Sequence, residues 1–217
     1  MNSLTRIVIV CTCSILPWGS LSAQDTRTIV LNPPDTTRGV SVMKALAARA
    51  SGSTYDSTEV SLRDLSDIMW AANGVNRPAT GKRTAPSAMN AQDIDVYACT
   101  KSGLYLYDAQ KHMLVRVAEG DHRKAVAGGQ PQMATAPLFV LLVSDISRFK
   151  SGVEGDKRVW GAEDAGIVSE NISLFCASVG LATRPRATMD RQKLGELLKL
   201  TASQQLILNH PVSYPRK

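Results

Sequence analysis

A short segment near residue 50 carries side chains suited to binding an anion. Arg49 stands where an apolar helical pattern ends, and Ser51 and Ser53 follow at alternate positions. An arginine presents a planar fork of donors that matches phosphate, and a serine hydroxyl adds a further hydrogen bond. The same residues also fit an exposed arginine and a serine at an ordinary helix end. The segment therefore indicates either a phosphate site or a simple helix terminus.

A polar turn over residues 86–92 leads directly into a predicted strand. It begins with Pro86 and contains two amide side chains, Asn90 and Gln92. An amide carries donors and an acceptor together, so this pair suits the edge of a heterocyclic ring. It suits equally the unpaired backbone groups of the turn itself.

A third segment is the helical candidate at residues 160–179. Apolar side chains occur all around it, which favours burial in the core or at a subunit contact. Small residues follow it, from Gly180 through Ala182 to Thr183, and they leave room for a flat group.

The usual motifs of other enzyme classes are missing from the sequence. His112, His122 and His210 are far apart, and none has a second ligand at metal-binding spacing. No G-x-S-x-G, P-loop or G-x-G-x-x-G pattern occurs. The net charge of +6 comes without a long basic run, so nucleic acid is not an expected partner. We therefore expect no metal and no catalytic acid or base.

The elements that must position these residues read as one α+β domain over residues 39–217. Helices are predicted at 40–50, 61–73, 160–179 and 190–200. Ser61 and Asp64 form the start signal of the second helix, and Gly180 closes the third. Strands are predicted at 94–100, 104–107, 113–117, 138–143 and 205–208. The first three strands form an antiparallel meander, and the fourth is apolar throughout, as a central strand is. Residues 75–85 are expected to be a basic loop.

In order and spacing, these segments resemble the nitroreductase-like FMN flavoprotein superfamily. Within it they look closest to the dehydrogenases that oxidise azoline rings in modified peptides. The helix end R-R-S-x-R-x-F/Y is matched by Arg49, Ser51 and Tyr55, and W-A-x-x-G by Trp70, Ala71 and Gly74. The motif P-S-x-x-N-x-Q is matched by Pro86, Ser87, Asn90 and Gln92. The motif D-x-G-x-x-x-x-N is matched by Asp164, Gly166 and Asn171. The motif G-L-x-[ST] is matched by Gly180, Leu181 and Thr183.

The resemblance implies a three-layer α+β fold with a mixed, mainly antiparallel central sheet flanked by helices. It also implies an intertwined homodimer with FMN at the subunit interface. By carry-over, the residues that hold the cofactor are Arg49, Ser51, Ser53, Pro86, Asn90, Gln92, Ala182, Thr183 and Arg216. Arg49 and Ser51 would hold the phosphate or ribityl chain, and Asn90 would bond the pyrimidine side of the ring. Arg216 would complete the phosphate site, with Lys217 as the second candidate.

The sequence departs from the family pattern at two basic positions, which are Ala50 and Ser53 here. A cation at the second position stabilises the negative charge that develops on the flavin during reduction. We expect Lys82, Arg83 or Arg184 to replace it if turnover is fast.

The implied reaction is hydride transfer through flavin N5 to a nitroaromatic, quinone or enone acceptor. Two alternatives stay open. One is a dehydrogenase of a peptide-derived ring, and the other is a non-catalytic flavin or small-ligand binding protein. NADH or NADPH is a possible reductant, although neither is expected outside the cytoplasm.

The N-terminus predicts a protein exported to the periplasm, a localisation drawn from residues 1–23 alone. Arg6 precedes an apolar run of about ten residues, and Leu21-Ser22-Ala23 offers a cleavage site. A membrane anchor would need roughly 20 apolar residues, so none is expected. Residues 24–38 are expected to form an extended arm. After cleavage only Cys99 and Cys176 remain, too few for a disulfide framework.

Overall fold

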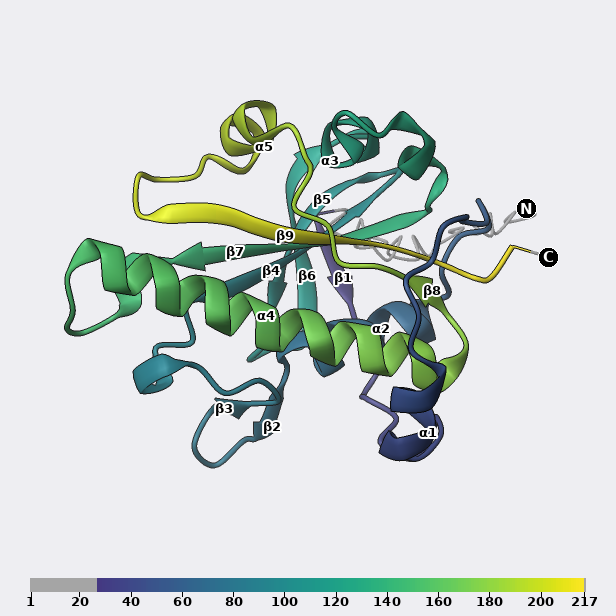
Figure 1. Cartoon of the computed structure of the whole chain (residues 1–217), viewed down its shortest axis with the longest axis horizontal. Helices are drawn as coiled ribbons and strands as arrows, with labels where there is room; N and C mark the ends of the chain where they lie inside the picture. Colours follow the sequence, from purple (N-terminus) through teal and green to yellow (C-terminus); the bar gives the residue numbers. More distant parts are fainter. Residues whose placement is uncertain (1–26, 217) are drawn as a thin grey trace, which may run out of the picture.

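The computed structural model describes residues 27–216, so the predicted signal peptide and Lys217 lie outside the described residues. A seven-stranded sheet of order β1-β6-β5-β4-β7-β9-β8 lies between helices on its two faces (Figure 1). The strands are β1 (Thr28–Val30), β4 (Ile94–Thr100), β5 (Gly103–Asp108), β6 (Met113–Glu119), β7 (Leu138–Asp145), β8 (Ala182–Thr183) and β9 (Gln204–Ser213). Each of the six neighbouring pairs is antiparallel. The predicted three-layer α+β fold with a mainly antiparallel sheet is confirmed.

The helices divide between the two faces of this sheet. On one face lie α1 (Val42–Ala48), α2 (Leu62–Asn73) and the long α4 (Glu154–Val179). On the other lie α3 (Arg123–Ala127) and α5 (Arg191–Leu198). The short 3-10 helices are η1 (Ala88–Asn90), η2 (Pro131–Thr135) and η3 (Ile146–Arg148). Figure 1 shows α4 running along the length of the sheet, so its two ends lie at opposite sides of the molecule.

Strand β7 forms the centre of the core. Leu138, Val140 and Leu142 pack toward α2 and α4, while the alternate residues pack toward α3 and α5. Side chains alternate between the faces of a sheet, so an apolar residue at every position requires cover on both faces. This is why the continuous apolar run predicted a central strand correctly.

The local start and stop signals act as predicted. Ser61 Oγ accepts the N–H of Asp64 at 3.1 Å and donates to its carboxylate at 2.7 Å, which starts α2. Gly180 ends α4 in the left-handed region, with φ +77°. Both signals are local side-chain and backbone chemistry, so they can be predicted without tertiary contacts.

Four elements differ from the expectation. Helix α4 begins six residues earlier than predicted, because its first turns are polar and carry a Glu154–Arg158 ion pair instead of an apolar stripe. Strand β9 continues past Leu208 to Ser213. Residues 75–85, expected as a loop, contain the hairpin of β2 (Val75–Arg77) and β3 (Lys82–Arg83). The expected N-terminal arm contributes β1 to the sheet edge.

The longer β9 is explained by where its proline lies. Pro211 has no N–H to donate, so a proline is found in strands only where the ladder hydrogen bond is not needed. It lies between the pairing of Val212 with Thr183 and the isolated bridge of Asn209 to Arg186. On the side of β9 that faces β8, the backbone hydrogen bonds are already interrupted at this point. A proline there therefore costs β9 little hydrogen bonding.

Cys99 and Cys176 are free and buried. They lie in the core clusters on opposite faces of the sheet, so no disulfide joins them. Burial raises the pKa of the Cys99 thiol to about 12 and also raises that of Cys176. Both behave as apolar core residues.

Candidate functional site

The segment that follows α1 lies against β8. Arg49 caps the C-terminal end of α1 and is exposed, as are Ser51 and Ser53. The N–H of Gly52 donates to the carbonyl of Thr183 at 2.8 Å. The buried Tyr55 donates its hydroxyl to the carbonyl of Gly52 at 3.1 Å, which fixes the turn. The fold therefore places the predicted anion-binding segment beside the predicted Ala182–Thr183 backbone.

The C-terminal residues reach the same place. Ala182 pairs with Ser213 in the sheet, and Ser213 Oγ accepts the N–H of Asp56 at 3.1 Å. Arg216 follows and is exposed. Hydrogen bonds from Thr58 lower the pKa of Asp56, and the charge of Arg216 adds to that effect. Three segments far apart in the sequence thus converge at the end of α4.

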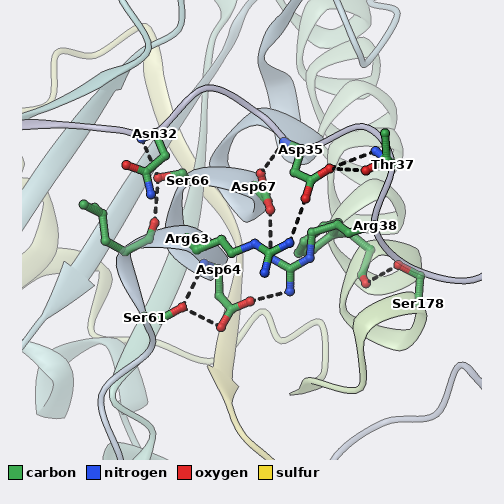
Figure 2. A network of polar contacts seen from close by, with 12 residues as sticks. Asn32, Asp35, Thr37, Arg38, Ser61, Arg63, Asp64, Ser66, Asp67 and Ser178 are labelled. Carbon is green, nitrogen blue, oxygen red and sulfur yellow. Dashed lines mark hydrogen bonds and ion pairs between the residues drawn. The ribbon is translucent and has the colours of Figure 1, made fainter.

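A network of polar contacts ties this tail to α2. Arg38 donates to Asp64 at 2.6 Å and to Asp67 at 2.7 Å, bridging the N-terminal segment to α2 (Figure 2). Tyr214 donates its hydroxyl to Asp64 at 2.8 Å and accepts the N–H of Ser61. Because two buried carboxylates share one arginine, the site from which Arg216 projects is firmly held.

The convergence creates excess positive charge. We call Arg49, Arg184, Arg186 and Arg216 the basic cluster. Arg49 and Arg184 form no ion pair or side-chain hydrogen bond within residues 27–216. The charges of Arg184 and Arg186 both act on Tyr55, although burial dominates and raises the pKa of that phenol to about 12.

Arg186 is the most informative member of the basic cluster. It is 7% exposed, yet its guanidinium donates only to neutral oxygens, those of Gln130, Asn209, Val126 and Ala127. Burial and the nearby Arg184 lower its pKa. A buried charge without a counter-ion is costly, and these four hydrogen bonds offset part of that cost for Arg186. Sequence reasoning missed Arg186 because no motif marks it.

A buried histidine supports β8 from below. His210 lies between Ser169 Oγ, at 2.8 Å from Nε2, and Thr183 Oγ1, at 3.3 Å from Nδ1. Burial lowers its pKa to about 3, so the imidazole is neutral at physiological pH. It positions Thr183 without adding charge.

The amide-bearing turn lies elsewhere, beside the N-terminal half of α4. Met89, Asn90 and Gln92 have φ of +54°, +53° and +50°, which makes them three of the five non-glycine residues with positive φ in the described chain. Non-glycine residues pay a conformational cost there, and such strain concentrates at functional sites. Asn90 is exposed and makes no printed side-chain contact with the described residues.

The other two residues predicted in this turn differ in role. Gln92 donates its side-chain amide to the carbonyl of Gly81 at 3.0 Å, and its N–H donates to Ser87 Oγ at 2.8 Å. It therefore joins the β2–β3 hairpin to the turn, as the backbone interpretation proposed. Pro86 is exposed at the entrance to the turn. Asn90 is the amide that stays free for a ligand.

The structure brings Arg49, Ser51, Ser53, Ala182, Thr183 and Arg216 together, but it leaves Pro86, Asn90 and Gln92 apart from them. The turn bonds to Asp164, whereas the basic cluster lies beyond Gly180. Sixteen residues of helix, at a rise of 1.5 Å each, separate the two by about 24 Å. Of the three basic substitutes considered, Arg184 lies in the basic cluster, and Lys82 and Arg83 lie in the hairpin beside the turn.

A cavity of about 780 Å³ lies in neither place. Its lining residues are Ile29, Ser57, Glu59, Val60, Leu62, Leu65, Thr100, Lys101, Ser102, Arg123, Pro137 and Leu138. None is a predicted site residue, and Arg123 there is already paired with Asp121. A site shared between two chains would not form a closed cavity in one chain.

Residues 27–216 contain no group of three or more histidine, cysteine or acidic side chains placed to hold a metal ion. No helix among them is long and apolar enough to cross a membrane.

Comparisons with known proteins point to one family. The model of the nitroreductase family matches residues 46–214. A candidate nitroreductase of Methanocaldococcus jannaschii is 29% identical over 165 residues, covering 71% of this chain and 82% of that protein. An FMN reductase (NAD(P)H) of Bacillus subtilis is 26% identical over 197 residues, covering 81% and 68%.

Two solved structures are also similar to this chain. The crystal structure of a candidate nitroreductase from Ralstonia eutropha has a TM-score of 0.82 and 34% identity, and the match covers 88% of this chain and 90% of that one. The microcin synthetase McbBCD complex of E. coli matches with a TM-score of 0.71 over 95% of this chain and 85% of that one. At 14% identity, the second likeness shows the fold alone.

Proposed function

The chain belongs to the nitroreductase family and is an oxidoreductase, and from this premise we propose that it binds FMN and passes hydride to a small-molecule acceptor. The observation that carries the proposal is the basic cluster, in which three distant segments present arginines and two of these, Arg49 and Arg184, form no ion pair with residues 27–216. When bound, FMN supplies the hydride-transfer chemistry through its N5 position. The protein binds it and orients the acceptor.

The basic cluster would hold the phosphate. Arg49 has its full set of guanidinium donors free, and Ser51 and Ser53 add hydroxyl donors beside it. Arg216 approaches from the C-terminal side. Arg184, from the same cluster, would add a further positive charge to the phosphate site. A phosphate anion would neutralise this excess charge, so the donor set fits the group.

The turn at residues 86–92 would hold the ring. Asn90 presents a free amide to the pyrimidine edge, in a backbone conformation that Asp164 and Gln92 hold in place. Pro86 would lie beside the ring, and the carbonyl oxygen of the Gln92 side chain remains available to it.

We infer a homodimer in which FMN lies at the subunit interface. The basic cluster and the turn are about 24 Å apart along α4, further than one FMN molecule extends. A second copy can bring its turn to the basic cluster of the first. Helix α1, which leads to Arg49, exposes Val42 at 68%, Met43 at 75% and Leu46 at 49%. An apolar helix face of this kind is suited to burial against another chain.

This arrangement predicts that Met43→Glu weakens both dimerisation and FMN binding. A charge placed in an apolar contact costs free energy on burial, and we expect the dimer dissociation constant to rise about tenfold or more. Analytical ultracentrifugation measures it, with Val117→Glu, an exposed apolar position on β6, as the control. A wild-type chain that stays monomeric with FMN bound would refute the interface.

The proposed acceptor is a nitroaromatic, quinone or enone, with NADH or NADPH as the reductant in vitro. The runner-up, oxidation of a peptide-derived ring, is favoured by the fold likeness to the microcin synthetase complex. Two reactions separate them. Under anaerobic conditions, NADPH should bleach the flavin and a quinone should restore its colour. If only an azoline peptide incubated in air is consumed, with the loss of two hydrogens by mass spectrometry, the dehydrogenase proposal replaces the reductase.

We also propose that the protein is exported to the periplasm, on the strength of residues 1–23 alone. A mature N-terminus at Gln24, found by mass spectrometry of the periplasmic fraction, would support export. An intact N-terminus in the cytoplasm would refute it. Export would make the physiological electron donor a molecule other than the cytoplasmic nicotinamide nucleotides.

A further inference from the structure

Helix α4 holds the ring-binding turn through one buried carboxylate. Asp164 is 3% exposed, and its two oxygens accept the N–H of Ala88 at 3.0 and 2.9 Å. Ala88 is the first residue of η1, and the left-handed residues Met89 and Asn90 follow it directly. The position of Asn90 therefore depends on Asp164, although the two residues are far apart in the sequence.

A second buried carboxyl lies at the other end of the same turn. Asp93 is fully buried and accepts the hydroxyl of Ser144 at 2.6 Å on Oδ2. Its Oδ1 is a buried oxygen without a hydrogen-bond partner among the described residues. Gly161, one turn before Asp164 on α4, passes so close that a Cβ there would lie 2.2 Å from Ser144 Oγ. The same Cβ would lie 3.4 Å from Asp93 Oδ2, so this part of α4 lies against Asp93, whose side chain interacts with that of Asp164.

The charged groups of the neighbouring elements are Asp95 on β4, Asp145 on β7, Arg148 on η3 and Arg83 on β3, and the charge of Arg83 acts on Asp95. Arg148 faces Asp93, but it is paired with Asp95 at 2.7 Å and lies 3.5 Å from Asp145. Burial, together with the adjacent Asp164, raises the pKa of Asp93 to about 7. Two carboxylates that share a buried site cannot both ionise without repulsion.

We propose that Asp93 and Asp164 form a carboxyl pair that holds a single proton, and that through this pair Asp164 acts as a positioning residue for Asn90. Asp93 keeps the proton, and both oxygens of Asp164 accept the backbone N–H of Ala88. The consequence for flavin rests on the proposed function. The contact between the pair and the turn is a property of the chain alone.

The proposal gives flavin binding a specific pH dependence. As the pH rises through the titration of the pair, the proton is lost and the two carboxylates repel each other. The turn then loses its anchor at Ala88, and Asn90 leaves the ring-binding position. Affinity for flavin is therefore expected to fall between pH 6 and pH 8.5. Because the phosphate of FMN also titrates, riboflavin, which lacks it, is the better probe.

The variants Asp93→Asn and Asp164→Asn distinguish the roles of the two carboxyl groups. In Asp93→Asn the amide mimics the protonated carboxyl permanently, so the turn stays anchored at both pH values. In Asp164→Asn the charged acceptor is lost, so the turn is loosely held at both pH values. Hydrogen exchange of the peptide spanning residues 86–92, corrected for intrinsic rates, reports this in the flavin-free protein. We expect about tenfold faster exchange where the turn is loose, as for losing a bond to a charged group.

Asp190→Asn is the matched control. Asp190 also accepts a backbone N–H, that of Lys193 at 3.0 Å, but it caps α5 on the opposite face. Asparagine caps a helix as well as aspartate does, so this variant should exchange and bind riboflavin like the wild type.

The proposal is overturned if Asp164→Asn protects the turn as the wild type does, or if Asp93→Asn keeps the wild-type pH dependence. Should Asp164→Asn fail to fold, the pH profile of Asp93→Asn decides alone. A wild-type protein that takes up no flavin refutes the proposed function. The hydrogen-exchange data still test the carboxyl pair in that case.

Discussion

Replacing Arg49 with alanine is expected to weaken FMN binding by about 10- to 100-fold, as expected for the loss of a charge-assisted hydrogen bond to phosphate. Arg49 ends α1 beside Ser51, and all of its donors are free for a ligand. Isothermal titration with FMN measures the change. The fold should remain intact, because the Arg49 side chain makes no hydrogen bond or ion pair with residues 27–216 that its loss would break.

Two comparisons make the Arg49 result specific. Riboflavin lacks the phosphate, so its affinity should fall much less in Arg49→Ala than that of FMN. Arg63→Ala removes another exposed arginine, whose side chain is paired with Asp35 on the surface, and should leave FMN binding unchanged. Equal FMN affinity in Arg49→Ala and the wild type would show that Arg49 does not bind the phosphate.

Replacing Gly161 with alanine is expected to lower the free energy of unfolding by roughly 3 kcal/mol, the cost of overpacking a close contact. The added Cβ would lie 2.2 Å from Ser144 Oγ and 3.4 Å from Asp93 Oδ2. Because both groups are buried and Ser144 belongs to the sheet, α4 has to move away. Urea denaturation measures the loss.

Gly195→Ala is the matched control for Gly161. Gly195 lies within α5, and nothing is within 4 Å of the Cβ it would gain. Alanine there should stabilise the protein by about 0.5–1 kcal/mol through helix propensity and chain entropy. If both variants are stabilised, the close packing of α4 on β7 is not as the structure shows it.

Features encoded by neighbouring residues were predictable from the sequence. Ser61 with Asp64 starts α2, Gly180 ends α4, and the apolar run of β7 indicates a covered strand. Each depends on chemistry within a few residues or on a simple alternation. The family resemblance added the order of the site segments, and its fold and family are confirmed.

What the sequence concealed depends on contacts between distant residues. Arg186 meets Gln130 and Asn209 only after β8 and β9 have paired, and Asp164 meets Ala88 across 76 positions. Nothing near Asp93 or Asp164 shows that they meet. The separation of Asn90 from Arg49 was equally hidden, because it is set by the length of α4.

The roles of individual site residues stay predictions, with one change of emphasis. Gln92 bonds the hairpin through its amide nitrogen, so Asn90 carries the ring-binding prediction. Arg184 lies in the basic cluster, whereas Lys82 and Arg83 lie beside the turn proposed to hold the ring, so all three stay candidates for the substitute cation.

The most direct test of the central claim is the visible absorbance of the purified protein, with the flavin released and counted against the chain. We predict a yellow protein that holds one FMN per chain and sediments as a dimer, because each dimer joins two basic clusters to two turns. A colourless protein that takes up no FMN when the cofactor is supplied would contradict the account.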